Sequence, residues 1–236
     1  MYTKFILRVR CNEGGEIRGI FAQALKKRLE DSVGFAFDCR IRYLNRYWKM
    51  SDLAVNPGER HSFEFTVFDR NAASLLISRL FNLRIHKTPL EIADSEFVVL
   101  DLIFRDNQVA ESACKDISLV INTPYLMKWG DVFMEKFEKE LFYRELFKNA
   151  SGLDGMCRSD FEKLLNKIDI DHSSLRTVGV RLNSFPAKGF MGELVFKFSE
   201  ASEDEMNMFY DILNHSCYRG IGARKEFGFG NLRFNI

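Results

Sequence analysis

The chain has 236 residues, of which 46% are hydrophobic and 28% are charged, a composition typical of globular proteins and not of disordered or low-complexity ones. Thirty-four Lys and Arg residues oppose 33 Asp and Glu residues, so the net charge of +1 does not indicate a strongly basic nucleic-acid binder, although local basic patches can still bind RNA. No apolar run reaches the ~18 residues of a membrane-spanning helix. The first residues, MYTKFILRVR, carry cations inside their apolar stretch and favour a strand over a secretory signal.

The cysteines and histidines indicate a reduced, metal-free protein. The five cysteines are odd in number, far apart and never in a Cys-x-x-Cys pair, which predicts neither a disulfide framework nor a zinc site. The four histidines are not spaced as metal ligands. We therefore expect a cytoplasmic protein with no metal, no cofactor and no membrane partner.

In the first half, the apolar period changes repeatedly between two, as in strands, and three to four, as in helices. Phe5, Leu7 and Val9 alternate with polar residues, and Pro57-Gly58 separates two later strands. The predicted elements are a strand over Thr3–Cys11, a helix over about Glu16–Glu30, strands over Phe35–Tyr43 and His61–Phe68, a helix over Asn71–Phe81 and a strand over Phe97–Phe104. Their order is β-α-β-β-α-β.

The second half predicts the same order with one additional short helix. Ser159 and Glu162 predict a capping box for that helix, and Ser202 and Glu205 predict another for the last helix. The predicted elements are a strand over Ile117–Leu126, a helix over Val132–Phe147, the short helix from Ser159, a hairpin of Val178–Leu182 and Leu194–Phe198 around a turn at Pro186–Gly189, a helix over Ser202–His215 and a strand over Asn231–Phe234.

Two copies of this order predict an α+β protein of two tandem ferredoxin-like modules with antiparallel sheets, a fold shared with RNA-recognition motifs. The polar stretch Arg105–Lys115 is the expected boundary. The modules then comprise residues 1–110 and residues 111–236.

The most specific motif is a glycine-rich loop over 219–230, RGIGARKEFGFG. It contains two Gly-hydrophobic-Gly triplets separated by five residues, with Arg224 and Lys225 between them. Successive backbone N–H groups in such a turn can bind an anion, and the cations add charge, so phosphate is the expected guest. The loop follows a helix and leads into a strand, which is the wrong context for a dinucleotide-binding loop. The alternative is a glycine-rich turn that serves only tight packing.

Three stretches resemble a known family. The loop Gly220-Ile221-Gly222 … Gly228-Phe229-Gly230, the stretch Lys188–Phe196 (KGFMGELVF) and the stretch Ile17–Leu25 (IRGIFAQAL) together resemble the CRISPR-associated endoribonucleases that cut precursor guide RNA within its repeats, the Cas six family of the repeat-associated (RAMP) RNA-binding superfamily. The resemblance implies precursor and mature CRISPR repeat RNA as partners, with an effector complex as a further one.

The resemblance also implies a reaction without metal. The ribose 2′-hydroxyl attacks the adjacent phosphate and leaves a 2′,3′-cyclic phosphate, a step that needs help with deprotonation, a donor for the leaving oxygen and a cation near the phosphate. Many members supply a histidine near the first helix, whereas this chain has no histidine before His61.

Four residues remain as catalytic candidates. Lys26 and Lys27 belong to a basic cluster on the first helix, where they either stabilise the developing charge or simply complement the helix dipole. Lys49 lies in an aromatic-basic segment that suits RNA contact or an ordinary amphipathic surface. His215 ends the last helix near the glycine loop and is either a titrating group or a helix-terminal residue stabilised by the dipole.

The other histidines, His61, His86 and His172, are expected on the surface. The candidate RNA-binding residues are Arg18, Arg219, Gly220, Gly222, Arg224, Lys225, Gly228 and Gly230. Charge supports this choice, because residues 1–46 hold ten cations against five acids and residues 215–236 hold four against one.

Two other functions remain open beside the endoribonuclease. One is a related subunit or silent paralogue that holds guide RNA without cutting it, and the other is a small-ligand regulatory module. Cutting of repeat RNA in EDTA separates the first from the enzyme, and thermal stabilisation by a metabolite but not by RNA identifies the second.

Overall fold

The computed structural model describes residues 2–17, 21–44, 53–106, 116–150, 157–182, 185–225 and 228–235. The chain divides into two compact units, Met1–Gln108 with Glu226–Gly228 and Val109–Lys225 with Phe229–Ile236. The boundary predicted in Arg105–Lys115 falls almost entirely outside the described residues.

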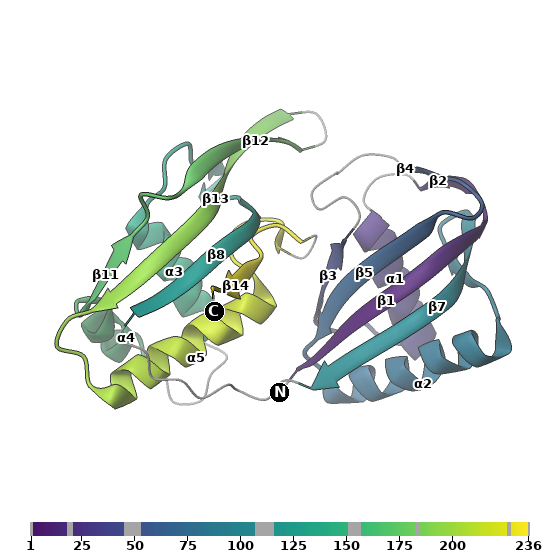
Figure 1. The fold of residues 1–236 in the computed structure, drawn as a ribbon, viewed down its shortest axis with the longest axis horizontal. Helices are drawn as coiled ribbons and strands as arrows, with labels where there is room; N and C mark the ends of the chain where they lie inside the picture. Colours follow the sequence, from purple (N-terminus) through teal and green to yellow (C-terminus); the bar gives the residue numbers. More distant parts are fainter. Residues whose placement is uncertain are drawn as a thin grey trace. The chain divides into compact units, whose positions relative to one another are not determined.

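The first unit is an antiparallel sheet covered on one face by two helices (Figure 1). Its elements are β1 (Thr3–Glu13), β2 (Gly15–Ile17), α1 (Phe21–Val33), β3 (Cys39–Tyr43), β4 (Leu53–Val55), β5 (Arg60–Val67), α2 (Arg70–His86), β6 (Leu90–Ile92) and β7 (Ser95–Asp106). The sheet order is β3-β5-β1-β7-β6, and β2 pairs with β4 separately. The four long strands of the β-α-β-β-α-β order are β1, β3, β5 and β7. Because β1 lies between β5 and β7, the sheet has the ferredoxin-like strand order.

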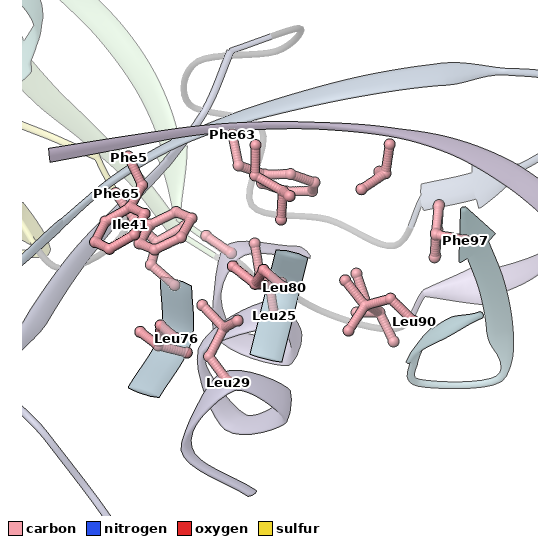
Figure 2. Packing of buried hydrophobic residues seen from close by; sticks show 14 of the residues in the cluster. Phe5, Leu25, Leu29, Ile41, Phe63, Phe65, Leu76, Leu80, Leu90 and Phe97 are labelled. Carbon is pink, nitrogen blue, oxygen red and sulfur yellow. The ribbon is translucent and has the colours of Figure 1, made fainter. Parts of the chain in front are cut away.

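The core of this unit lies between the sheet and the helices, and Figure 2 shows its packing. Phe5 of β1 stacks on Phe65 of β5 with ring centroids 4.6 Å apart. Leu25 and Leu29 of α1 and Leu76 of α2 are fully buried opposite these rings. The period of two in the strands and of three to four in the helices therefore places the buried apolar side chains of both kinds of element on the same side.

Two predicted boundaries in this unit are wrong. The helix predicted from Glu16 begins at Phe21, since Gly15–Ile17 forms a strand that pairs with β4. The strand predicted from Phe35 begins only at Cys39. In both cases the apolar pattern of the sequence extends over residues that backbone hydrogen bonding leaves outside the element.

The second unit has the same kind of sheet with three helices on one face (Figure 1). Its elements are β8 (Asp116–Tyr125), β9 (Lys128–Trp129), β10 (Val132–Phe133), α3 (Lys139–Ala150), α4 (Arg158–Leu165), β11 (Ile168–Asp171), β12 (Arg176–Leu182), β13 (Phe185–Phe198), α5 (Glu203–Arg219) and β14 (Leu232–Phe234). The order is β11-β13-β8-β14, with β12 paired to β13. The predicted α+β class with antiparallel sheets is confirmed.

Several local predictions in this unit are corrected. Val132 and Phe133 form a hairpin strand with β9, so α3 starts at Lys139 and not at Val132. The Ser159 capping box does not form, because α4 begins one residue earlier and Cys157 is its N-cap residue.

The sequence does not predict the strand β11. It pairs with the end of β13, where the sequence predicts the segment of β12. Pro186–Gly189 is not a turn but part of β13, where it pairs with β12. The capping box of Ser202 and Glu205 on α5 is confirmed.

Candidate nucleic-acid interface

The glycine-rich loop begins at the end of α5 and is closed by its own backbone. Gly220 N–H donates to the Ser216 carbonyl at 2.7 Å, and Ile221 N–H donates to the Gly230 carbonyl at 2.9 Å. Ala223 N–H donates to Leu126 O and Gly230 N–H donates to Pro124 O, which fastens the loop to the end of β8. These amides are therefore engaged inside the protein, so they do not form the anion-binding turn that the sequence suggested.

Two of the glycines are required by the conformation. Gly222 has a φ of 79°, and a Cβ there would lie 2.5 Å from the ring of the fully buried Tyr125. Gly230 has a φ of 59°, and a Cβ there would collide with the carbonyl oxygen of Ile221. A side chain at either position would strain the backbone; at Gly222 it would also push the loop away from the end of β8, and at Gly230 it would force the two ends of the loop apart.

Asn149, a buried residue in the last turn of α3, forms hydrogen bonds with the glycine-rich loop and with the end of α5. Its Nδ2 donates to the Gly220 carbonyl at 2.9 Å and to the Ser216 hydroxyl at 3.2 Å. Its Oδ1 accepts a hydrogen bond from Lys225 Nζ at 2.9 Å. One neutral amide thus orients both ends of the first half of the loop. Sequence reasoning missed it, although a polar residue that continues the apolar stripe of Phe142 and Leu146 signals a buried hydrogen-bonding role.

His215 is buried and accepts a hydrogen bond from Arg219. The Arg219 Nε–His215 Nε2 distance is 2.9 Å. Burial, followed by the positive charges of Arg219 and Lys225, lowers the pKa of His215 to about 4. The imidazole is therefore neutral at pH 7, and because its Nε2 accepts, its proton lies on Nδ1. His215 orients Arg219 without neutralising its charge.

Arg224 is the exposed cation of the loop, and it adopts a left-handed backbone with a φ of 60°. Gly228 groups with the first unit. There Gly228 has a φ of 92°, and a Cβ on it would lie 3.2 Å from Cγ of Arg42. The structure thus brings together Arg219, Gly220, Gly222, Lys225, Gly230 and His215 in the second unit.

The lysines of α1 belong to the first unit. Lys26 Nζ lies 3.7 Å from Glu30 Oε1 across one helical turn, with about a third of its side chain exposed. Lys27 is exposed. The neighbouring Arg28 lies 4.0 Å from Glu91 of the first unit. Ion pairs as exposed as that of Lys26 and Glu30 contribute little to stability, so little free energy is lost when this pair is broken.

No protein-family model and no curated protein matches the chain. Solved structures do match in fold over the whole chain. A Cas6 product complex matches with a TM-score of 0.68 at 16% identity, covering 100% of both chains. The product of a Cas6-related gene from Pyrococcus furiosus matches with a TM-score of 0.60 at 10% identity, covering 100% of this chain and 99% of that one. A RAMP protein described as binding different RNA substrates matches with a TM-score of 0.57 at 11% identity, covering 99% and 100%. The chain has the Cas6 fold.

Within this Cas6 fold, two predicted site residues cannot be placed. Arg18 and Lys49 lie outside the residues that the structure describes.

The prediction that His61 is a surface residue is wrong. It is 4% exposed and packs at the edge of the Phe21 and Phe97 rings. Its Nδ1 shares a 2.7 Å hydrogen bond with the Tyr43 hydroxyl. The reason is the register of β5, in which position 61 points to the same side as Phe63 and the core. His86 and His172 are exposed as expected, and His86 ends α2 instead of lying in the turn that follows it.

In the described ranges, no group of three or more His, Cys, Asp or Glu side chains is placed to hold a metal ion. No helix in those ranges has the length and apolarity to span a membrane.

Proposed function

We propose that the protein is a metal-independent endoribonuclease that binds CRISPR repeat RNA, cleaves the precursor guide RNA and retains the mature guide RNA. The observation that carries the proposal is the likeness in fold, over the full length of both chains, to Cas6 structures described as product complexes. The glycine-rich loop supports it, because that motif carries the resemblance in the sequence and is built to present cations.

Arg219, Arg224 and Lys225 are proposed to contact the RNA backbone. Arg219 and Lys225 are held by His215 and Asn149, which are both neutral acceptors. A neutral acceptor fixes the direction of a cation without itself adding a negative charge, which is compatible with binding of a phosphate. Gly220, Gly222, Gly228 and Gly230 contribute by allowing the loop its backbone conformation. Arg18 is proposed as a further phosphate contact from the first unit.

The chemistry is proposed to use the 2′-hydroxyl of the RNA as the nucleophile, so that the protein only has to stabilise charge and transfer protons. Lys26 and Lys27 on α1 are the proposed charge-stabilising residues, and Lys49 is the proposed alternative. His215 is the least suited of the candidates to proton transfer, because it is buried and its Nε2 already accepts from Arg219. We assign it a positioning role for Arg219.

A second candidate function is a subunit that binds guide RNA without cutting it. It is favoured by the histidines, because the chain has none before His61, and both His61 and His215 are buried. This alternative keeps the RNA-binding role of the loop and removes the catalytic role of the lysines.

The test uses the purified protein and the repeat RNA of the CRISPR array nearest its gene. We expect cleavage to persist in EDTA, to leave a 2′,3′-cyclic phosphate, and to stop when the 2′-hydroxyl at the cut site is replaced by hydrogen while binding continues. Single variants Lys26→Ala, Lys27→Ala, Lys49→Ala and His215→Ala identify the contributing group. Loss of one charge-stabilising donor should slow cleavage by about 10²–10³-fold with little change in affinity.

Cleavage that requires a divalent cation would refute the reaction. Tight binding without any cleavage would establish the non-catalytic subunit instead. Failure to retard repeat RNA at all would refute both candidate functions.

A further inference from the structure

A cavity of about 630 Å³ lies in the second unit between α3, α4 and the β9–β10 hairpin. Its volume is in the range of sites that bind small ligands or single residues of a polymer. All of its lining residues belong to the second unit, and none of them is part of the glycine-rich loop.

The walls of the cavity are mainly apolar and aromatic. Phe147 of α3, Phe161 and Leu165 of α4, and Trp129 of β9 all line it. The Trp129 side chain is 57% exposed, whereas large aromatic side chains usually bury most of their surface. A largely exposed indole in the wall of an apolar cavity can stack on a flat ligand.

The charged side chains that line the cavity are three cations, Arg144, Lys148 and Arg158, and two carboxylates, Glu140 and Glu162. The Arg144 guanidinium lies 4.8 Å from the centre of the Trp129 ring, and no carboxylate among the described residues pairs with it. Lys148 and Arg158 also line the cavity and pair with Glu145 and Glu162 in ion pairs in which both cations are more than half exposed. Such pairs are weak, so a phosphate can replace the carboxylates. An arginine stacked on an indole, with no carboxylate partner among the described residues, favours a ligand that is both flat and anionic.

We propose that this cavity binds an unpaired nucleotide of single-stranded RNA, with its base stacked on Trp129 and its phosphate on Arg144. Stacking on an aromatic ring combined with cations along the backbone is the general way in which proteins hold single-stranded RNA. The proposal rests on the proposed RNA-binding function and adds to it a second contact point for RNA, separate from the glycine-rich loop.

Trp129 also provides the measurement. The chain has two tryptophans, so Trp48→Phe leaves Trp129 as the single fluorescent indole. We expect a short single-stranded oligouridylate, and uridine monophosphate at higher concentration, to quench this fluorescence saturably. Trp129→Ala should weaken oligouridylate binding about 5- to 150-fold, the equivalent of ~1–3 kcal/mol per stacked base. Arg144→Ala should lower the log–log salt slope by about 0.7.

Trp129→Phe, which keeps an aromatic ring, should retain most of the affinity, and Val132→Ala changes an exposed side chain of the same hairpin and should change nothing. Circular dichroism confirms that each variant is folded. Unquenched fluorescence together with unchanged affinity of Trp129→Ala, in a protein that still retards repeat RNA, would overturn this site and leave the proposed function intact. If the protein retards no RNA, the proposed function fails, and the uridine monophosphate titration still decides whether the cavity takes a nucleotide. An oligomer that dissociates in Trp129→Ala would assign the cavity to a second copy of the chain and overturn the proposal.

Discussion

At the scale of single residues, the interface depends on neutral side chains that hold cations. His215 and Asn149 both lie in the interior, and each accepts a hydrogen bond from a cation of the glycine-rich loop. A carboxylate in either place would orient the cation more strongly but would also neutralise it. The neutral acceptors therefore suit a surface whose proposed partner is an RNA phosphate.

The pKa of His215 makes this arrangement measurable. Its folded pKa of about 4 lies below its ordinary value of 6.5, so the unfolded chain takes up the proton first as the pH falls. The contribution of His215 to stability is complete above pH 6.5, is lost between pH 6.5 and about 4, and levels off below that. The loss amounts to at most about 3 to 4 kcal/mol at 1.36 kcal/mol per pKa unit.

Urea unfolding of the wild type and of His215→Gln, compared between pH 4 and 7, tests this. Glutamine can accept a hydrogen bond from Arg219 but does not titrate. The free energy of unfolding of the variant should therefore fall less than that of the wild type between pH 7 and pH 4. Parallel curves for the two proteins would show that His215 is not buried as a neutral group.

At the scale of elements, capping decides where two helices of the second unit begin. Both Ser159 and Ser202 precede a glutamate by three residues, yet only Ser202 caps a helix. Its hydroxyl accepts from Glu205 N–H at 3.3 Å, and the Glu205 carboxylate accepts from Ser202 N–H at 2.8 Å. Ser159 lies inside α4, where its hydroxyl cannot cap the first turn.

These two serines form a matched pair of variants. Ser202→Ala should destabilise the protein by about 1 kcal/mol, because an N–H group at the start of α5 loses its acceptor. Ser159→Ala should change stability by less than about 0.5 kcal/mol. Thermal unfolding of both variants measures the difference, and equal losses would contradict the assignment of the caps.

At the scale of the whole molecule, the proposed RNA binding should become weaker as the salt concentration rises, because each phosphate contact releases counterions. Arg224 is exposed, so Arg224→Ala should leave the melting temperature unchanged and lower the log–log salt slope of repeat-RNA binding by about 0.7–0.9. Arg79, an exposed cation on α2, is the control, and Arg79→Ala should not alter the slope. A slope unaffected by Arg224→Ala would mean that the loop does not touch phosphate.

Much of the fold follows from local periodicity, because a strand or helix with one buried face needs apolar residues at the period of that element. Phe5, Leu7 and Val9 predicted β1, and Phe63 and Phe65 predicted β5. The same alternation places His61 inside, but its polar side chain suggested the surface. The four-residue β11 escaped detection because Ile168 also fitted the helical spacing of the segment before it.

The sequence by itself determined the α+β class, the order of the main elements and the position of the glycine-rich loop, since each depends on residues close together in the chain. Only the tertiary structure decided what the loop does with its hydrogen-bonding groups. Its N–H groups donate to the Gly230 carbonyl and to carbonyls at the end of β8. Lys225 donates to Asn149, which lies 76 positions earlier in the chain. The cavity beside Trp129 was decided in the same way, because it exists only where α3, α4 and β9 meet. Contacts between distant residues carry no local period, and the chain has to fold before they are formed.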